Sequence, residues 1–198
     1  MMSTPLPTTR PARADARRNY DLLVSAAREA FAEHGTDTSL EEIARRAGVG
    51  IGTLYRRFPN RTALLEAVYV DEIQSVCDRA YGYAEKLGPY DALAAWLRSF
   101  VGYSISKKSL AGELTVALGK DSEFFTACKV NVREAGELLL NAAKKEGTVR
   151  EELQLMDILR LVGGITMGRD MDRDQAERLL EIVLAGLKPT ADESPSPA

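Results

Sequence analysis

Apolar residues recur along most of the chain every three or four positions, which is the period of an amphipathic helix. Residues 17–34 show this pattern first, and Gly35 then ends it, since glycine is favoured just after a helix C-terminus. The apolar face of this helix consists of Leu23, Ala27, Ala30 and Phe31. No stretch alternates apolar and polar residues convincingly, as a half-buried strand would. The pattern predicts an all-α protein.

Two short helices are expected next. Ser39 begins the first of them, and Glu42 stands three positions later, the spacing of a capping box. Gly48 ends it, because glycine accepts the positive φ of a sharp reversal. The following short helix carries Thr53 and its neighbours and stops at Pro59. Three helices in about forty residues, with a tight turn before the last, are typical of a helix-turn-helix that places its second helix in the DNA major groove.

A long helix is expected over residues 61–87, where Gly88 and Pro89 break the pattern. Further helices are predicted at about 90–107, 110–119, 122–146, 153–168 and 173–188, for about nine in total. Residues 1–16 and 189–198 are rich in Pro, Ser, Thr and Ala without periodicity, which indicates disordered ends.

Charge is distributed unevenly along the 198 residues, although the net charge is only −3. Residues 1–70 carry ten Arg and eight acidic residues, while residues 71–198 carry 16 basic and 21 acidic residues. Arginine suits paired contacts with phosphates and bases. Cys77 and Cys128 are isolated, and no secretory signal precedes them, so we expect a cytoplasmic protein. No apolar run approaches the ~18–20 residues of a membrane span.

Candidate catalytic and metal-binding residues are few. His34 is the only histidine, and it stands in the last turn of a helix, where a cation complements the helix dipole. Asp170, Asp172 and Asp174 resemble a metal cluster, but carboxylates at a helix start more often cap free N–H groups. No phosphate-binding glycine loop or CxxC pair occurs. We therefore expect no enzyme, no cofactor and no metal.

The segment from Thr38 to Leu65 reads TSLEEIARRAGVGIGTLYRRFPNRTALL and resembles the TetR family of bacterial transcription regulators. That family shows the pattern I-A-x-x-A-G-V-S-x-G-T-L-Y-x-x-F-x-x-K-x-x-L-L. The matching residues are Ile43, Ala44, Ala47, Gly48, Val49, Gly52, Thr53, Leu54, Tyr55, Phe58, Leu64 and Leu65. The resemblance covers about residues 19–65; beyond them only helix number and order agree.

The resemblance implies a role in DNA binding for individual positions. Ser39 and Tyr55 would contact phosphates, Gly52 would allow close approach to the backbone, and Arg56 and Arg57 would recognise base edges, with guanine as the natural partner. Arg61 stands where the family usually has Lys and would bind phosphate. The full expected set is Arg17, Arg18, Ser39, Gly50, Ile51, Gly52, Thr53, Tyr55, Arg56, Arg57 and Arg61.

Some positions leave alternatives open. Gly50 replaces a common Ser and so loses a hydroxyl contact and a helix cap, and Ile51 is apolar and could meet a thymine methyl. Arg45 and Arg46 are either phosphate contacts or, more often, a solvated helix face. Arg10 and Arg13, in the N-terminal arm, either follow the phosphates or minor groove or merely aid solubility.

The resemblance further implies a C-terminal body that binds a ligand and dimerises through its last two helices. The expected interface consists of Leu155, Ile158, Leu159, Val162, Ile165, Leu179, Leu180, Val183, Leu184 and Leu187, and Leu161 and Ile182 widen its apolar surface. An aromatic and sulfur set either lines a ligand pocket or belongs to the core: Trp96, Phe100, Tyr103, Phe124, Phe125, Cys128, Met156 and Met167.

The sequence thus predicts a basic arm (1–16), a helix-turn-helix DNA-binding domain (17–65), a helical ligand-binding and dimerisation domain (66–188) and a tail (189–198). The expected function is that of a homodimeric repressor that leaves its palindromic operator when an unknown small-molecule effector tilts the long helix; activation is an alternative. A rival class is a helical ligand-binding or enzyme-like protein with a relic helix-turn-helix, and a third is an interaction scaffold. The polar surface of Thr53, Arg56 and Arg57 argues against a relic.

Overall fold

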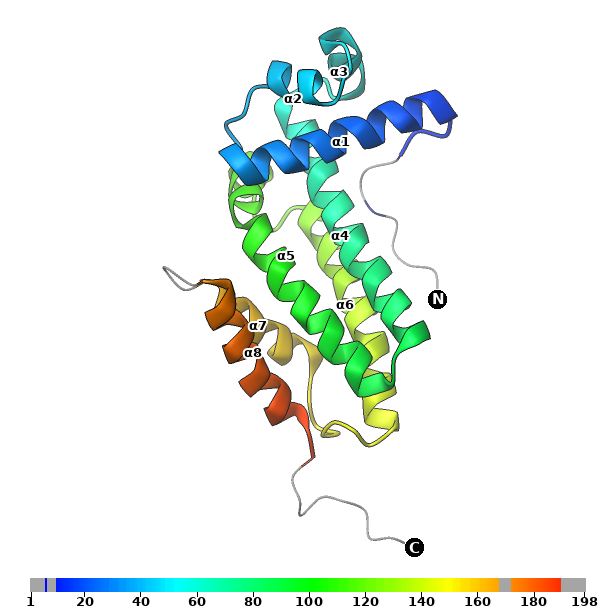
Figure 1. Cartoon of the computed structure of the whole chain (residues 1–198), viewed down its shortest axis with the longest axis vertical. Coiled ribbons are helices and arrows are strands. Elements are labelled where there is room, and N and C mark those ends of the chain that lie inside the picture. The colour runs from blue at the N-terminus through cyan, green and yellow to red at the C-terminus, as the bar shows by residue number, and fades with distance from the viewer. Residues whose placement is uncertain (1–5, 7–9, 168–171, 190–198) are drawn as a thin grey trace, which may run out of the picture. The chain divides into compact units, whose positions relative to one another are not determined.

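A computed structural model describes residues 6, 10–167 and 172–189, without the side chains of residues 106–108, 167 and 173 (Figure 1). Regular structure in this part of the chain is entirely helical, which confirms the expected all-α class. The eight helices of the described residues are α1 (Ala14–His34), α2 (Leu40–Arg46), α3 (Ile51–Arg57), α4 (Arg61–Lys86), α5 (Pro89–Leu118), α6 (Glu123–Lys145), α7 (Leu155–Met167) and α8 (Arg173–Leu187).

The helices differ from those expected mainly in two places. The helices predicted at about 90–107 and 110–119 form one continuous helix, α5, so the described residues contain one helix fewer than expected. The polar residues at positions 107–109 include neither Gly nor Pro, and Lys and Ser are tolerated inside helices. In addition, α1 begins at Ala14, inside the expected disordered arm.

The chain forms two compact units, and both of them are discontinuous in sequence. Unit 1 contains residues 1–74 and 106–129, and unit 2 contains residues 75–105 and 130–198. Each of α4, α5 and α6 therefore contributes residues to both units. The sequence placed its boundary after residue 65, whereas unit 1 also takes in the end of α5 and the start of α6.

The core of unit 1 joins α1 to the helices that follow it. Leu23, Ile43, Leu54 and Leu64 are completely buried, and so is Leu114 from α5. Figure 1 shows α2 and α3 together on one side of α1. Burial of a large aliphatic side chain contributes about 1.5–3 kcal/mol. These contacts hold the three N-terminal helices as one body.

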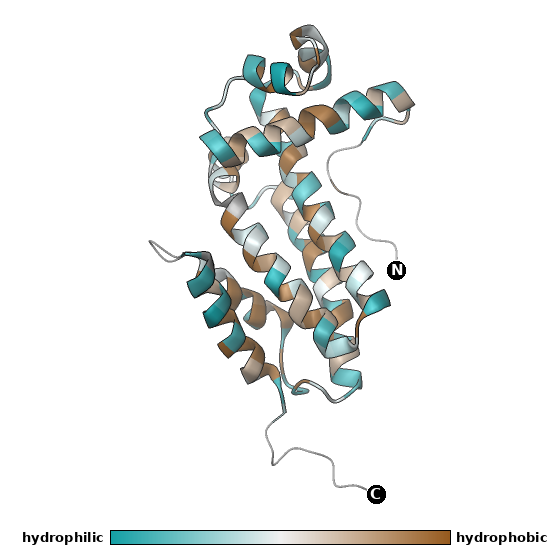
Figure 2. Ribbon diagram, in the orientation of Figure 1, coloured by the Kyte–Doolittle hydropathy of each residue, from teal (hydrophilic) through white to brown (hydrophobic). Residues whose placement is uncertain are grey.

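The core of unit 2 is built around Trp96, which is fully buried and donates its indole N–H to the carbonyl oxygen of Val76 at 3.1 Å. Gly136 of α6 lies against this ring, because a Cβ atom placed there would approach Trp96 to 2.6 Å. Figure 2 shows α7 as predominantly hydrophobic. The end of α8 is fixed by the Arg150 N–H, which donates to the carbonyl oxygen of Leu187 at 3.0 Å.

Asp172 caps α8, because its side chain accepts a hydrogen bond from the Gln175 N–H at 2.6 Å. This agrees with the expected capping role; Asp170 lies outside the described residues. Within residues 6, 10–167 and 172–189, no three His, Cys, Asp or Glu side chains are grouped so as to bind a metal. Of the helices that the structure describes, none is long and apolar enough to cross a lipid bilayer.

Candidate nucleic-acid interface

The turn between α2 and α3 has the geometry that a helix-turn-helix requires. Gly48 has a φ of +64°, and its N–H donates to the carbonyl oxygen of Arg45 at 3.2 Å. The Val49 N–H donates to the carbonyl oxygen of Ala44 at 3.0 Å, which completes a Schellman motif. Ala44 and Leu54 are buried between the helices. The chain therefore reverses tightly and fixes α3 against α2.

The outer face of α3 is exposed and chemically mixed. Ile51 is 39% exposed and Tyr55 is 45% exposed, and Gly52 and Arg56 are exposed beside them. Positions 51, 52, 55 and 56 share one face of a helix, because their spacings are one and four residues. We call these four residues the α3 outer face. The ring of Tyr55 belongs to this surface.

Thr53 and Arg57 lie at the margin of the α3 outer face. The Arg56 guanidinium donates to Thr53 Oγ1 at 2.8 Å. Arg57, expected to contact bases, is half-buried, and its guanidinium carbon lies 4.9 Å from the centre of the Tyr20 ring on α1. A cation over an aromatic face is attracted by the electron density of the ring. Arg57 therefore joins α3 to α1 in this structure.

Ser39 lies at the start of α2 as expected. Its hydroxyl accepts a hydrogen bond from the Glu42 N–H at 3.2 Å, which forms half of the predicted capping box. The Glu42 carboxylate does not complete the box, because it binds Arg45 and Arg46. Gly50 precedes α3 and supplies no side-chain cap.

Arg45 and Arg46 are both paired through Glu42, at N···O distances of 2.8 Å. Arg46 also contacts Glu33 of α1 at 2.7 Å, so it joins α1 to α2. Hydrogen bonds from Arg45 and Arg46 lower the pKa of Glu42 from 4.5 to about 2, and the Arg46 hydrogen bond lowers the pKa of Glu33. Arg46 thus has a structural role, whereas Arg45 has an exposed side chain.

Arg61 makes internal contacts at the position where a phosphate contact was expected. Its Nη1 donates to the carbonyl oxygen of Thr38 at 2.7 Å, and its Nε lies 3.9 Å from Glu113 Oε2. The guanidinium carbon also lies 5.8 Å from the centre of the Phe31 ring. The arginine is held among residues of α1, α5 and the segment before α2.

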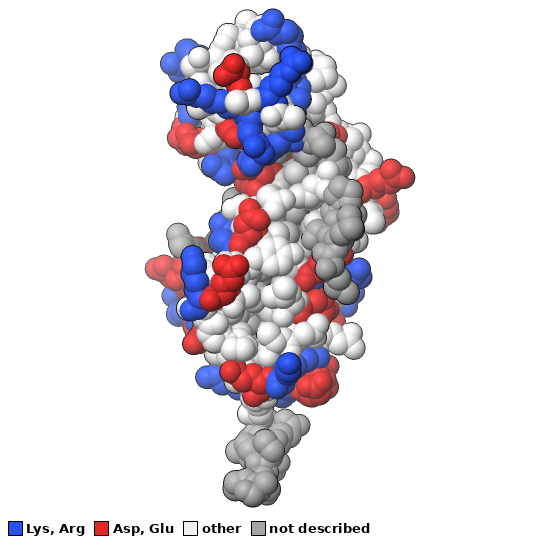
Figure 3. Space-filling model, turned by 90° about the vertical axis from the view of Figure 1, so that its right-hand side faces the viewer, with Lys and Arg blue, Asp and Glu red and all other residues white. Residues whose placement is uncertain are grey.

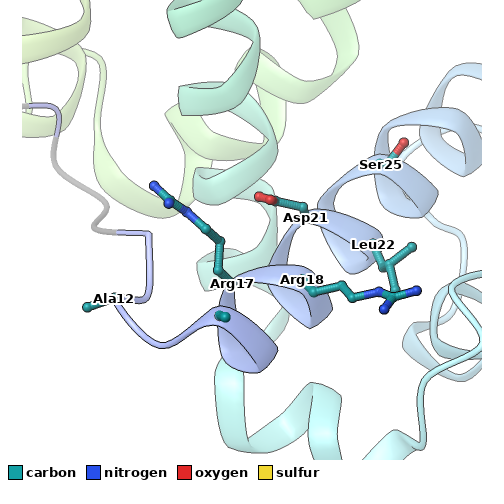
Figure 4. Close-up of a pocket in the computed structure, with 7 residues that line it drawn as sticks. Ala12, Arg17, Arg18, Asp21, Leu22 and Ser25 are labelled. Carbon is teal, nitrogen blue, oxygen red and sulfur yellow. The ribbon is translucent and has the colours of Figure 1, made fainter.

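Arg17 and Arg18 are exposed at the start of α1, and within the described part of the chain neither forms an ion pair. Figure 4 shows their side chains extending in different directions from neighbouring positions. They border an open depression of about 520 Å³, together with Asp21, Leu22 and Ser25. Figure 3 shows basic side chains gathered over α1–α3, with some acidic ones among them.

Arg10 contacts α1 and α4, although the sequence placed it in a disordered arm. It lies 3.3 Å from Asp21 and 3.0 Å from Asp71, and Arg28 contacts the other oxygen of Asp71 at 3.2 Å. Arg13 stands at the N-cap position of α1. The residues before α1 therefore include at least one that pairs with the folded part of unit 1.

The expected ligand set falls into two groups, one in each unit. In unit 2 the rings of Trp96, Phe100 and Tyr103 follow one another at 5.7 and 5.5 Å and are buried. In unit 1 Phe124 and Phe125 pack on Tyr69, and Cys128 is buried. Met156 is 43% exposed, and the side chain of Met167 is not among those that the structure describes. A ligand-binding role for this set stays a prediction.

The expected dimer set contains residues that are buried within the protomer and residues that are half-buried. Six members are buried within the protomer: Leu155, Ile158, Val162, Leu180, Leu184 and Leu187. The other four members, Leu159, Ile165, Leu179 and Val183, are half-buried. Leu161 is 59% exposed and Ile182 is 69% exposed, so the outer apolar surface of α7 and α8 centres on residues that the sequence treated as additions.

Comparison with known proteins extends the likeness beyond the helix-turn-helix. Residues 23–68 match the family described as bacterial regulatory proteins, tetR family, and residues 88–189 match the C-terminal domain of SbtR-like transcriptional regulators. The chain belongs to the TetR family. The expected resemblance is thereby confirmed. The chain is a DNA-binding transcription regulator of this family.

Two crystal structures of TetR-family regulators resemble the whole fold. The protein from Streptomyces coelicolor is 39% identical with a TM-score of 0.76, and the alignment covers 87% of this chain and 99% of that one. The protein from Mycobacterium vanbaalenii is 30% identical with a TM-score of 0.71, and the alignment covers 90% of this chain and 100% of that one. A helix-turn-helix-type regulator of Staphylococcus aureus is 39% identical over 62 residues, 30% of this chain and 32% of its own length. The chain thus spans about a third of that curated relative.

Sequence reasoning missed residues of α1 and α5 that contact the end of α3 and the start of α4. Tyr20 was assigned no role, yet it packs against Phe58 at 5.5 Å and carries the Arg57 guanidinium. Glu113 stands some fifty residues from its partner, Arg61, in the sequence. No local pattern marks such pairs, because they depend on how distant helices pack.

Proposed function

We propose that this TetR-family protein is a homodimeric repressor that binds a palindromic operator and leaves it when a small-molecule ligand binds. The observation that carries the proposal is the α3 outer face, where Ile51, Gly52, Tyr55 and Arg56 are presented to solvent. A helix that enters the major groove needs an accessible face with hydrogen-bonding side chains, which Tyr55 and Arg56 supply here. Arg17 and Arg18 add exposed positive charge on α1 for phosphates.

The exposed residues suggest separate roles. Arg56 offers the fork of donors that matches O6 and N7 of guanine. Ile51 is an apolar group of a size to meet a thymine methyl. Tyr55 offers its hydroxyl to phosphate, and Gly52 adds no side chain between the helix and the DNA, with nothing within 4 Å of its Cβ position. Of the three polar residues that argue against a relic, Arg56 remains exposed, whereas Thr53 and Arg57 lie at the margin of the α3 outer face.

Two arguments support dimerisation: the exposed apolar residues of α7 and α8, and the two-fold symmetry of a palindromic operator. Leu161 on α7 and Ile182 on α8 are large apolar residues that the protomer leaves exposed. A second copy would cover them and would present two recognition helices to half-sites about 34–36 Å apart, one turn of DNA. Release by a ligand requires that the ligand bind more tightly to the conformation that cannot bind the operator.

Binding to DNA that flanks the protein's own coding region tests the proposal. The wild-type protein should protect a palindromic segment in a footprint, and its affinity should fall steeply with added salt. Arg56→Ala should weaken binding to that segment by roughly tenfold to a hundredfold while leaving non-specific binding nearly unchanged, as expected when one bidentate base contact is lost. Equal losses on both kinds of DNA would assign Arg56 to phosphate. No protected palindrome with the wild type would contradict the proposal.

A further inference from the structure

Arg61, the first residue of α4, contacts three segments of unit 1 that are distant in sequence. Its Nη1 donates to the Thr38 carbonyl oxygen at 2.7 Å, its Nε faces Glu113 of α5 at 3.9 Å, and the guanidinium lies over Phe31 of α1. About two thirds of its side chain is removed from solvent, since 32% is exposed. An arginine that grips phosphate needs its donors directed outwards.

The C-terminal part of α5 contacts the helix-turn-helix at a second point. Ser109 and Glu113 are four residues apart, so they project from one face of α5. The Ser109 hydroxyl lies 3.2 Å from the Thr36 hydroxyl, and Thr36 is buried. Both links reach the short segment between α1 and α2, because Arg61 connects Glu113 to Thr38 in the same segment.

The segment held in this way leads directly into the proposed DNA surface. Thr38 precedes Ser39, whose hydroxyl caps α2. Thr38 is itself fixed to the end of α1, because its hydroxyl donates to the Gly35 carbonyl oxygen at 2.9 Å. A displacement of the Thr38 carbonyl would therefore move the start of α2 relative to α1.

We propose that Arg61 is a positioning residue for DNA binding, which acts with Glu113 of α5 to hold the start of α2, and that it does not bind the phosphate backbone. The inference rests on the proposed DNA surface only for its affinity readout. It also makes the end of α5 a part of the DNA-binding unit, so that a change in α5 is felt at α2. Contacts between Arg61 and phosphate would require its present partners to be released.

Salt dependence of DNA binding separates positioning from phosphate contact. Arg61→Gln should weaken operator binding about threefold to tenfold with the slope of log K against log salt unchanged, whereas loss of a phosphate contact lowers that slope by about one. Arg18→Gln, at an exposed position, supplies the contrasting case with a reduced slope. A slope reduced by about one in Arg61→Gln would overturn the inference.

Glu113→Gln provides the second arm, since it removes a negative charge and should by charge alone favour DNA binding. If Glu113 and Arg61 act together, Glu113→Gln should weaken operator binding about as much as Arg61→Gln does. The double variant should then bind the operator no more weakly than either single variant, as for residues that act as a unit. Asp121→Asn removes the same charge from an exposed position and should not weaken binding. Tighter binding by Glu113→Gln, or additive losses in the double variant, would overturn the inference.

Hydrogen exchange of the free protein gives a readout that needs no DNA. In Arg61→Gln and in Glu113→Gln the amides of Glu42 and Ile43, which donate to Ser39, should exchange several-fold faster, because the start of α2 is less well held. Unchanged exchange there would overturn the inference even if the wild type bound no DNA. Absence of wild-type DNA binding with faster exchange in the variants would instead count against the proposed function alone.

Discussion

Arg56 and Arg57 are adjacent and carry the same side chain, yet the structure gives them opposite surroundings. Arg56 is exposed on the α3 outer face, whereas Arg57 is half-buried over Tyr20. A rotation of about 100° along the helix separates neighbouring residues, so one of the two faces α1 and the other faces solvent. The contrast makes them a matched pair for separating stability from DNA contact.

Arg57→Ala should lower the free energy of unfolding by about 0.5–2 kcal/mol, because the contact with Tyr20 and the packing of the side-chain stem are lost. Arg56→Ala should leave it within about 0.5 kcal/mol, as is usual for an exposed position. Urea denaturation of both variants measures the difference. Equal stabilities would show that the Arg57 contact contributes nothing to the fold.

Glu42 predicts a specific dependence of stability on pH. Its pKa in the folded protein is about 2, against an ordinary 4.5, because Arg45 and Arg46 hydrogen-bond the ionised carboxylate. The stabilisation is therefore complete above pH 4.5 and is lost as the pH falls through about 2. The stabilisation should also shrink at high salt, since Arg45 is exposed and Glu42 and Arg46 are in part accessible to solvent.

Glu42→Gln should consequently be less stable than the wild type near pH 7, with the difference narrowing as the pH approaches 2. Glu41→Gln is the control, since Glu41 is exposed and forms no ion pair among the described residues. Thermal unfolding from about pH 2 to pH 7 measures both variants. A difference for Glu42→Gln that does not change with pH would contradict the assigned ion pairs.

The residues of the proposed DNA surface were predictable to the extent that they depend on local pattern. Ile51, Gly52, Tyr55 and Arg56 follow from the helical period once Leu54 is assigned to the core. Arg57 and Arg61 were not predictable, because their partners come from α1 and α5 and only tertiary packing brings them close.

At the scale of helices, glycine and proline mark the ends well, and polar residues alone do not. Gly35, Gly48, Gly119 and Gly147 each follow a helix with positive φ, as their chemistry predicts. The break expected inside α5 had no such residue and does not occur. The number of helices could therefore be predicted only where glycine or proline marks a helix end.

Gly136 of α6 has a different role, since its missing side chain makes room for Trp96 and Leu155. A Cβ atom there would approach Trp96 to 2.6 Å and Leu155 to 2.8 Å, which is closer than real contacts allow. Gly136→Ala should therefore destabilise the protein by about 1–3 kcal/mol through overpacking, despite the better helix propensity of alanine.

Gly82→Ala in α4 is the matched control for Gly136→Ala. It also lies inside a helix, but nothing is within 4 Å of its Cβ position. It should be neutral or stabilising by up to about 1 kcal/mol. Chemical denaturation should show that Gly136→Ala is less stable than the wild type and that Gly82→Ala is not; destabilisation of the same size by both would exclude the steric explanation.

At the scale of the whole molecule, the exposed apolar residues of α7 and α8 predict the state of association. The double variant Leu161→Glu, Ile182→Lys should shift the protein from dimer towards monomer, because charged groups would have to be buried in the interface. Sedimentation at micromolar concentration measures the mass. The control Leu138→Glu alters an exposed leucine of α6 and should leave the mass unchanged.

An unaltered dimer in the double variant would place the interface elsewhere. The sequence could suggest the two helices but not the surface residues, because both faces of α7 and of α8 carry apolar side chains. Periodicity alone cannot separate a face buried in the protomer from one buried by a partner. Leu184, at 2% exposed, and Ile182, at 69%, are told apart only by the fold.

The discontinuous make-up of unit 1 has a consequence for how such regulators can be recombined. Residues 106–129 return to the N-terminal helices and supply Leu110, Leu114, Phe124 and Phe125, all of them buried. A fragment that ended at residue 74 would leave the apolar surface beneath them open to water. Residues 1–74 therefore cannot be transferred alone to the C-terminal domain of another regulator. A chimera that uses them must also include residues 106–129.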